Sequence, residues 1–180
     1  MTPTNQRTSA EGPEHSARIV VGVDGSRGSL KALLWALGEA RARQFSVHAV
    51  FAWEYHPPWV DPGLGSMFPL AYQPEGSVPE DDFATTTASV EQLLDATISK
   101  VTESDPDRAS GQVPLTRDTL QGHAAHVLLK SVSETDTLVV GSHGHGGFIG
   151  AVLGSVSQQV VSHSRCPVVV VPAPQRTANG

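Results

Sequence analysis

Two glycine-rich segments carry the residues of this sequence that are best suited to bind an anionic ligand. One is Asp24-Gly25-Ser26-Arg27-Gly28-Ser29, and the other spans residues 141–154, where six of the 17 glycines lie. Glycine has no Cβ, so its backbone N–H can approach a ligand closely. The second segment has the spacing Gly141-x2-Gly144-x9-Gly154-Ser155, and a helix is expected to begin at its end. The free N–H groups and the positive end of the helix dipole at such a start bind phosphate groups.

The charges around the second segment favour the same chemistry. Residues 131–164 contain no lysine or arginine, and residues 137–164 contain no aspartate or glutamate. A phosphate group would therefore be held by the backbone, with no side-chain cation to assist and no carboxylate to repel it. The alternative is a glycine-rich loop that is flexible and binds nothing.

Histidines near these segments raise the question of a metal site. His143 and His145 are close in sequence, and His123 and His126 have the i, i+3 spacing of one helix face. Two histidines without a third ligand are a weak signal, and no His-Glu-x-x-His motif is present. We expect no structural metal site, and we expect His143 to form hydrogen bonds within the phosphate-binding loop.

The elements that must position the two segments alternate between strands and helices. Short apolar runs rich in valine predict buried strands, and apolar residues three and four positions apart predict amphipathic helices. Ser26 or Ser29 is expected to cap the first helix, and Pro114 favours an edge position for the third strand. The predicted strands are residues 18–24, 45–53, 113–120, 137–141 and 168–171, and the predicted helices are residues 29–43, 90–104, 123–132 and 152–162.

This alternation predicts a single α/β domain with an open, parallel, five-stranded sheet and helices on both faces. The predicted strands are largely apolar, as strands buried on both faces are. In such sheets a ligand binds beyond the carboxyl ends of the strands, where the strand order reverses. With the order 3-2-1-4-5, both glycine-rich segments frame one crevice. The domain is expected over residues 18–172, with flexible tails at 1–17 and 173–180 and a long loop rich in proline and glycine at 54–82.

The composition limits the classes of function. The chain has 180 residues and a net charge of −6, which argues against a basic surface that follows a nucleic acid or an anionic membrane. The charge is uneven, because residues 54–107 carry 11 acids and one base. No apolar run is long enough to span a membrane, and the first residues do not resemble a signal peptide. Cys166 is the single cysteine, so no internal disulfide can form, and we expect a cytoplasmic protein.

Four sequence motifs resemble those of the universal stress protein family. They are Ile19-Val20-Val21-Gly22-Val23-Asp24-Gly25-Ser26, Val139-Val140-Gly141-Ser142-His143-Gly144, Leu153-Gly154-Ser155-Val156-Ser157 and Cys166-Pro167-Val168-Val169-Val170-Val171. The resemblance covers about residues 18–172, and the complete G-x2-G-x9-G-[ST] spacing resembles that of the family's ATP-binding branch. It implies a flavodoxin-like or Rossmann-like fold, a bound ATP or other adenine nucleotide with Mg²⁺, and a homodimer in which residues 168–171 pair with their twin.

The resemblance also implies a role for each motif residue. Gly141 and Gly144 would line the ribose and the phosphates, and the start of the following helix would donate hydrogen bonds to the phosphates. Asp24 would serve the nucleoside end or a bound metal, and Val23 and Ala52 would flank the adenine. The full set of expected binding residues is Gly22, Val23, Asp24, Ala52, Val140, Gly141, Ser142, His143, Gly144, Gly154, Ser155 and Val156.

Together these features predict a non-catalytic ATP-binding protein that regulates a stress response through its dimer or an unknown protein partner. No Walker motif G-x4-G-K-[ST] is present, so no lysine is placed to neutralise charge on a γ-phosphate. One alternative is slow ATP hydrolysis or autophosphorylation that uses Asp24 and Mg²⁺. Another is flavin-dependent electron transfer, which expects its phosphate loop after the first strand, whereas the fuller glycine loop here follows the fourth.

Overall fold

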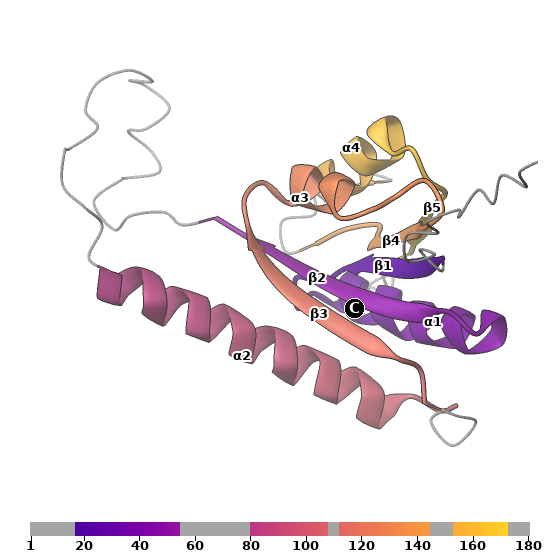
Figure 1. Cartoon of the computed structure of the whole chain (residues 1–180), viewed down its shortest axis with the longest axis horizontal. Coiled ribbons are helices and arrows are strands. Elements are labelled where there is room, and N and C mark those ends of the chain that lie inside the picture. Colours follow the sequence, from indigo (N-terminus) through magenta and orange to yellow (C-terminus); the bar gives the residue numbers. More distant parts are fainter. Residues whose placement is uncertain (1–16, 55–79, 108–111, 145–152, 173–180) are drawn as a thin grey trace, which may run out of the picture.

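The computed structural model describes residues 17–54, 80–107, 112–144 and 153–172 (Figure 1). The predicted tails at 1–17 and 173–180 and the predicted loop at 54–82 lie almost entirely outside these residues, so they stay predictions. Strands and helices alternate in the predicted order. The elements are β1 (Arg18–Gly22), α1 (Arg27–Arg43), β2 (Ser46–Trp53), α2 (Glu80–Ser104), β3 (Leu115–Gln121), α3 (Ala124–Lys130), β4 (Thr137–Gly141), α4 (Ser155–His163) and β5 (Val168–Val171).

The five strands form one parallel sheet in the order β3-β2-β1-β4-β5, which confirms the predicted fold. β1 lies in the centre, where Ile19 pairs with Val47 of β2 and with Thr137 of β4. β3 is an edge strand, as Pro114 predicts, and its side chains are partly or fully exposed. The strand order reverses between β1 and β4, so the ends of these two strands mark the expected binding crevice.

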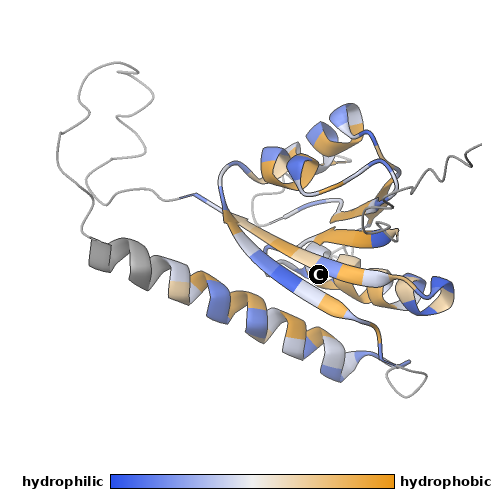
Figure 2. Ribbon diagram, viewed as in Figure 1, coloured by the Kyte–Doolittle hydropathy of each residue, from blue (hydrophilic) through white to orange (hydrophobic). Residues whose placement is uncertain are grey.

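Helices cover both faces of the sheet, with α1 and α2 on one face and α3 and α4 on the other (Figure 1). Successive residues of β1 alternate between the two cores, because Ile19 and Val21 pack with α1 and α2 while Val20 packs with α3 and α4. Figure 2 shows apolar residues on the central strands and along one side of each helix. The central strands are therefore buried on both faces, which explains their apolar sequences.

The sequence determines both ends of α1 locally. Ser26 is the N-cap, and its hydroxyl accepts a hydrogen bond from the N–H of Ser29 at 3.2 Å. Of the two expected candidates, Ser26 is therefore the one that caps the helix. The helix ends at Gln44, whose φ of 59° lies in the left-handed region. Arg41 and Arg43 occupy the last turn, where positive charge interacts favourably with the helix dipole.

The start of α2 differs from the prediction. The helix begins at Glu80, well before Val90, the first of its periodic apolar residues, so the predicted loop ends before Asp82. Residues 80–87 hold acids and threonines without apolar periodicity, which hides the helix from pattern analysis. Acids are nevertheless favourable near a helix N-terminus. Neither α2 nor any other described helix is long and apolar enough to cross a membrane.

The last two helices are both shorter than predicted. α3 begins after His123 and ends at Lys130, where Ser131 is the C-cap. α4 begins at Ser155, with Gly154 as its N-cap, instead of at residue 152. The prediction that a helix begins at the last two residues of the glycine motif is therefore confirmed.

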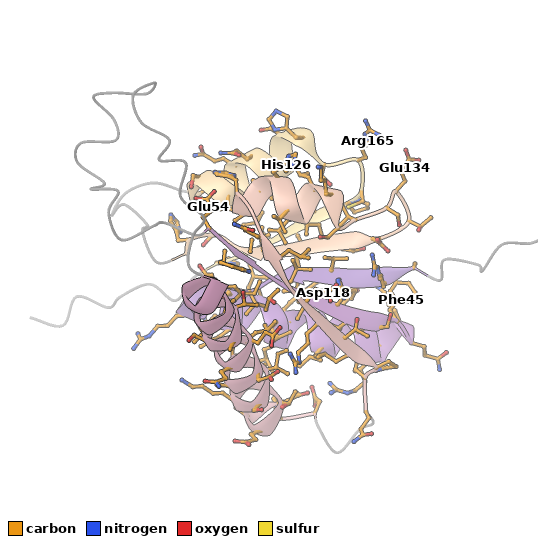
Figure 3. All side chains as sticks on the ribbon, turned by 60° about the vertical axis from the view of Figure 1, so that its left-hand side comes forward. Phe45, Glu54, Asp118, His126, Glu134 and Arg165 are labelled. Atoms are coloured by element: carbon orange, nitrogen blue, oxygen red, sulfur yellow. The ribbon has the colours of Figure 1, made fainter. Side chains whose placement is uncertain are left out.

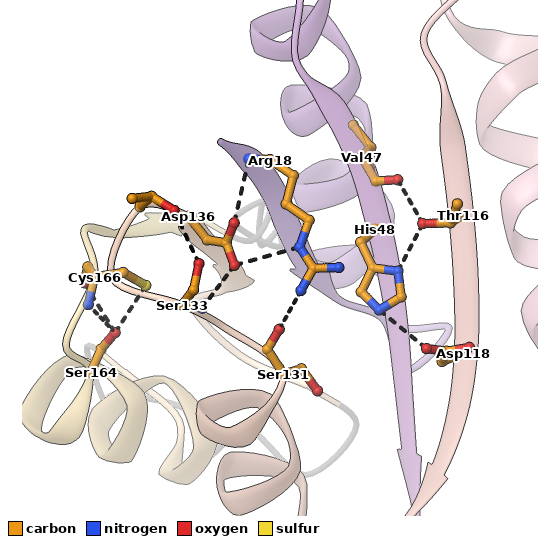
Figure 4. A network of polar contacts seen from close by, with 11 residues as sticks. Arg18, Val47, His48, Thr116, Asp118, Ser131, Ser133, Asp136, Ser164 and Cys166 are labelled. Carbon is orange, nitrogen blue, oxygen red and sulfur yellow. Dashed lines mark hydrogen bonds and ion pairs between the residues drawn. The ribbon is translucent and has the colours of Figure 1, made fainter. Parts of the chain in front are cut away.

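A polar network joins β1 to the turn before β4 (Figure 4). The buried carboxylate of Asp136 accepts hydrogen bonds from the N–H of Ser133 at 2.8 Å and the N–H of Arg18 at 3.4 Å. The Arg18 guanidinium forms an ion pair with the same carboxylate at 3.5 Å and donates to the carbonyl of Ser131 at 2.9 Å. Burial acts to raise the pKa of Asp136, but the hydrogen bonds from Ser133 and the charge of Arg18 outweigh it, so the pKa lies below its ordinary value.

His48 of β2 lies beside this network (Figure 4). Its Nδ1 is 2.8 Å from Oγ1 of Thr116, and its Nε2 is 3.3 Å from the carboxylate of Asp118. Burial, and after it the Arg18 guanidinium, lowers the pKa of His48, while the carboxylates of Asp118 and Asp136 act in the opposite direction. The folded protein therefore favours the neutral imidazole.

Candidate functional site

A cavity of about 520 Å³ opens at the carboxyl ends of β1 and β4, where the strand order reverses. Both glycine-rich segments border it, so the crevice expected from the strand order is present. Eleven of the twelve predicted binding residues line it, and Ser142 does not. The complete lining is Gly22, Val23, Asp24, Ser26, Ser29, Val50, Ala52, Ala124, Leu128, Val140, Gly141, His143, Gly144, Leu153, Gly154, Ser155, Val156, Ser157 and Gln158.

The N-terminus of α4 borders one end of the cavity. Gly154 is the N-cap in an extended conformation, and no side chain caps the helix. The first hydrogen bond of the helix runs from the N–H of Gln158 to the carbonyl of Gly154 at 2.9 Å. The N–H groups of the three residues between them therefore have no acceptor within the helix. Since the first turn also contains no acidic residue, this end of the cavity suits a phosphate group.

Ser142 stabilises the start of α4 through hydrogen bonds to its backbone carbonyl. Its carbonyl accepts hydrogen bonds from the N–H of Gly154 at 2.7 Å and from the hydroxyl of Ser157 at 3.0 Å. Its own hydroxyl is 3.1 Å from Nδ1 of His143, so a contact of His143 within the loop is present as expected. Ser142 is buried and is the one predicted binding residue outside the cavity lining, so its place among the binding residues stays a prediction.

The two glycine-rich segments touch through their backbones. A Cβ at Gly28 would lie 2.3 Å from the carbonyl oxygen of His143, and a Cβ at Gly141 would lie 2.7 Å from the carbonyl carbon of Gly28. Real Cβ atoms essentially never approach a heavy atom within 3.0 Å, so the present geometry requires glycine at both positions. The sequence pattern indicates no role for Gly28, because its contact with His143 exists only once β1 and β4 are neighbours.

Asp24 connects the first segment to the second. Its Oδ1 accepts a hydrogen bond from the N–H of Ser26 at 2.9 Å, and its own N–H donates to the hydroxyl of Ser29 at 3.3 Å. A Cβ at Gly144 would lie only 2.5 Å from Oδ2 of Asp24, so this carboxylate lies directly against the Gly144 backbone. Among the described residues that line the cavity, Asp24 is the one aspartate or glutamate, and no lysine or arginine joins it.

The other end of the cavity is apolar. Val23, Val50, Leu128 and Val140 line it and are almost fully buried, with at most 3% of each exposed. Ala52 adds a small side chain from β2. Apolar walls of this kind accept the flat ring of a base, so the cavity combines an apolar end with an end of backbone N–H groups.

Eight lining residues are absent from the predicted set, and topology explains three of them. Val50 enters from β2 because its carbonyl accepts a hydrogen bond from the N–H of Val23 at 2.9 Å, just beyond β1. Ala124 and Leu128 lie one turn apart on α3, which begins at the same end of the sheet. The predicted strand order could have found these three residues, since it places the second strand next to the first and requires the helix after the third strand to cross to the fourth, past the crevice.

Comparison with known proteins agrees with this geometry. The model of the universal stress protein family matches residues 16–172. The chain belongs to the universal stress protein family. A universal stress protein of Mycobacterium tuberculosis is 33% identical over 158 residues, which make up 88% of this chain and 46% of that protein. The chain thus spans about half the length of the curated relatives it matches.

Solved universal stress protein structures share the fold. One, in complex with cAMP, has a TM-score of 0.57 and 23% identity and covers 88% of this chain and 98% of its own. Another, from Archaeoglobus fulgidus in complex with dAMP, has a TM-score of 0.50 and 19% identity and covers 87% of this chain and 98% of its own. This likeness supports the α/β architecture described above.

Proposed function

We propose that this universal stress protein binds an adenine nucleotide, with ATP as the expected form, in the cavity between the ends of β1 and β4. The division of that cavity into an apolar end and an end of backbone N–H groups carries the proposal. An adenine ring fits the first and phosphates fit the second. The volume of about 520 Å³ is typical of small-molecule sites. Two solved family structures hold cAMP and dAMP, which are adenine nucleotides.

The residues present also fit a Mg²⁺ ion that accompanies the nucleotide. Proteins hold Mg²⁺ through one or two carboxylates together with phosphate oxygens and water. Asp24 supplies one carboxylate at the cavity, and no cluster of three or more possible ligand side chains occurs in the described parts of the chain. A bound Mg²⁺ would supply positive charge between Asp24 and the phosphates and so reduce their repulsion.

We further propose a non-catalytic regulator in the cytoplasm, whose nucleotide occupancy alters its dimer or its protein partner. The described cavity lining offers no lysine or arginine to stabilise charge that develops during phosphoryl transfer. Contacts that hold substrate and transition state equally well give binding without acceleration. Slow hydrolysis or autophosphorylation is the second candidate, because Asp24 lines the cavity and could hold Mg²⁺.

Nucleotide binding can be tested on the purified protein. It is denatured, the released small molecules are separated by chromatography, and nucleotide-free protein is titrated calorimetrically with ATP and Mg²⁺. We expect an adenine nucleotide in the extract and one binding site per chain. Gly144→Ala should weaken binding at least about tenfold, since the new Cβ would press against Asp24. Gly38→Ala is the matched control, because a Cβ there meets nothing within 4 Å.

The outcomes separate the candidate functions. An extract without adenine nucleotide, together with no heat on titration, would refute the nucleotide proposal. A released flavin would replace it with the electron-transfer alternative. Steady ATP turnover that disappears in Asp24→Ala would favour hydrolysis over non-catalytic regulation.

We also propose that β5 forms a homodimer with its twin in a second copy. β5 is an edge strand, and all four of its valines are partly exposed. The N–H of Leu138 in β4 donates to the carbonyl of Pro167, and the N–H of Ser142 just after β4 donates to the carbonyl of Val171. Alternate residues of a parallel strand face the same neighbour, so the main-chain groups of Val168 and Val170 point away from β4. They are free to pair with another strand.

Light scattering on the eluting protein tests the dimer. Val170→Pro removes one outward N–H, and an edge strand tolerates proline where its N–H faces away from the sheet. We expect the wild type to elute as a dimer and the variant as a folded monomer with an unchanged circular dichroism spectrum. A variant that stays dimeric, or a monomeric wild type, would contradict pairing through β5.

A further inference from the structure

A second cavity, of about 510 Å³, lies at the opposite end of the α3–α4 layer from the nucleotide cavity. The nucleotide cavity includes the starts of α3 and α4, whereas this one is lined by α3 from His126 onward, by the last residue of α4 and by residues that follow the two helices. The two share no lining residue. We propose that this second cavity, the α3–α4 groove, binds a small molecule that carries two or more phosphate or carboxylate groups.

Basic side chains enter the groove from two sides. His126 and Lys130 lie one turn apart on α3, while His163 ends α4 and Arg165 follows it. All four are exposed. Figure 3 shows His126 and Arg165 on the part of the molecule that carries α3 and α4. Donors on both sides can bind different anionic groups of one ligand, and each contact is strengthened by the charge of the donor or the acceptor.

The fixed charges of the groove are not used by the fold. Glu134 is the one carboxylate among the described lining residues, and Figure 3 shows it on the same part of the surface as Arg165. The ion pairs of the described chain involve Arg18, Arg41, Arg43, His48 and Arg117, and neither Lys130 nor Arg165 takes part in one. Both cations are thus available to a ligand, in a chain whose net charge is −6.

Helix dipoles account for only part of this arrangement. Lys130 and His163 occupy the last turns of their helices, where a positive charge is favourable without any ligand. His126 lies in the first half of α3 and Arg165 lies beyond α4, so the dipoles require neither. The convergence of all four residues on one cavity is the feature that points to a ligand.

Donors within the protein already engage the carbonyl groups of Val127 and Ser131 at the end of α3. The N–H of Ser131 donates to the carbonyl of Val127 at 3.0 Å, and its hydroxyl donates to the same carbonyl at 2.9 Å. The Arg18 guanidinium donates to the carbonyl of Ser131 at 2.9 Å. The negative ends of these peptide dipoles are therefore already engaged by donors.

Charge and size restrict the class of ligand. A metal ion is excluded as the ligand, because no group of three or more histidine, cysteine or carboxylate side chains in the described residues could hold one. An extended nucleic acid needs a long basic surface, which a chain with a net charge of −6 does not offer. A cavity of about 510 Å³ with basic groups on two sides matches a compact polyanion.

The experiment uses tripolyphosphate as the phosphate probe and citrate as the carboxylate probe, at constant ionic strength. Binding to the full chain is measured by calorimetry and mapped by amide NMR shifts. We expect one site per chain for at least one probe, with the largest shifts near Lys130, Glu134 and Arg165. The double variant Lys130→Ala/Arg165→Ala should bind about tenfold more weakly, because exposed charged contacts contribute a few-fold each.

The matched control is Lys31→Ala/Lys100→Ala, which removes the same total charge from exposed positions on α1 and α2, across the sheet. It should bind the probes like the wild type, and both double variants should keep the wild type's nucleotide affinity. Equal loss in the two double variants would reduce the effect to general electrostatics and overturn the proposal. Shifts confined to Gly144 and Ser155, or no binding of either probe, would also overturn it.

Discussion

The backbone contact between Gly28 and the loop after β4 predicts a large effect from the smallest possible side chain. In Gly28→Ala the new Cβ would lie 2.3 Å from the carbonyl oxygen of His143. The neighbouring atom belongs to the backbone, so no side-chain rotation can relieve the clash. The two segments would have to separate by roughly 1 Å to restore an ordinary carbon–oxygen contact of about 3.3 Å.

Two opposing effects determine the size of the change. Alanine favours a helix over glycine by up to about 1 kcal/mol, and less in the first turn, where Gly28 lies. Overpacking in a close-packed interior costs about 1–3 kcal/mol, and Gly28 is buried against the backbones of Gly141 and His143. After the gain in helix propensity is subtracted, we expect Gly28→Ala to lower the free energy of unfolding by about 0.5–2.5 kcal/mol. It should also weaken nucleotide binding, because the carbonyl that must move lies next to Gly144.

Urea unfolding followed by tryptophan fluorescence measures this change, since Trp53 is buried and becomes exposed on unfolding. Gly38→Ala is the internal control, as it makes the same substitution in the same helix with nothing within 4 Å of the new Cβ. It should raise the free energy of unfolding by about 0.5–1 kcal/mol. If Gly28→Ala unfolds at the wild-type urea concentration, or if both variants are destabilised alike, the close approach of Gly28 to His143 does not limit stability.

Three further predictions concern buried ionisable side chains. Asp136→Asn should lower the free energy of unfolding by about 1–3 kcal/mol at neutral pH. Because the pKa of Asp136 is lowered in the folded protein, its carboxylate stabilises the fold above the ordinary pKa of 3.8. Urea titrations should therefore show that the difference in stability between wild type and variant shrinks as the pH falls below that value. His48→Gln should make the free energy of unfolding less sensitive to acid. The neutral form of His48 stabilises the fold above its ordinary pKa of 6.5, and that contribution is lost at lower pH. A free energy of unfolding with unchanged pH dependence would contradict this. Arg41→Ala should destabilise by about 2–4 kcal/mol, since it leaves the Asp105 carboxylate, only 6% exposed, without its partner at 2.7 Å. Arg43→Ala, which removes an exposed arginine, should change the free energy of unfolding by less than about 0.5 kcal/mol, and equal effects of the two arginine variants in thermal unfolding would count against the argument.

The sequence predicts most of the fold because the buried strands are runs of largely apolar residues. The apolar runs of β4 and β5 begin and end in the structure at the predicted residues, since strands buried on both faces need apolar side chains throughout. The start of α2 escapes prediction for the opposite reason. Residues 80–87 have no apolar periodicity, and periodicity is the signal from which a helix is inferred.

The candidate site is predicted in part for a similar reason. A glycine that approaches a ligand and a glycine that approaches another segment look the same in a sequence. Gly28 has the second role and Gly144 lies in the cavity lining, yet both are simply members of a glycine-rich run. Ser142 also lies inside the motif, and there its carbonyl holds the start of α4 while the residue does not line the cavity. Only the packing of β4 beside β1 separates these roles.

Helix polarity explains why an acidic chain can provide two different kinds of anion site on one layer of helices. The starts of α3 and α4 line the nucleotide cavity, where unbonded N–H groups and the positive dipole end attract phosphate without any lysine or arginine in the described lining. The ends of the same helices line the α3–α4 groove, where the dipole has the opposite sign. An anion can be held at that end only if side chains supply the positive charge. Lys130 and Arg165 are placed to do so. If the proposed groove is occupied as inferred, the two sites should differ in salt dependence, because exposed side-chain charges are screened by salt far more than partly buried backbone dipoles are.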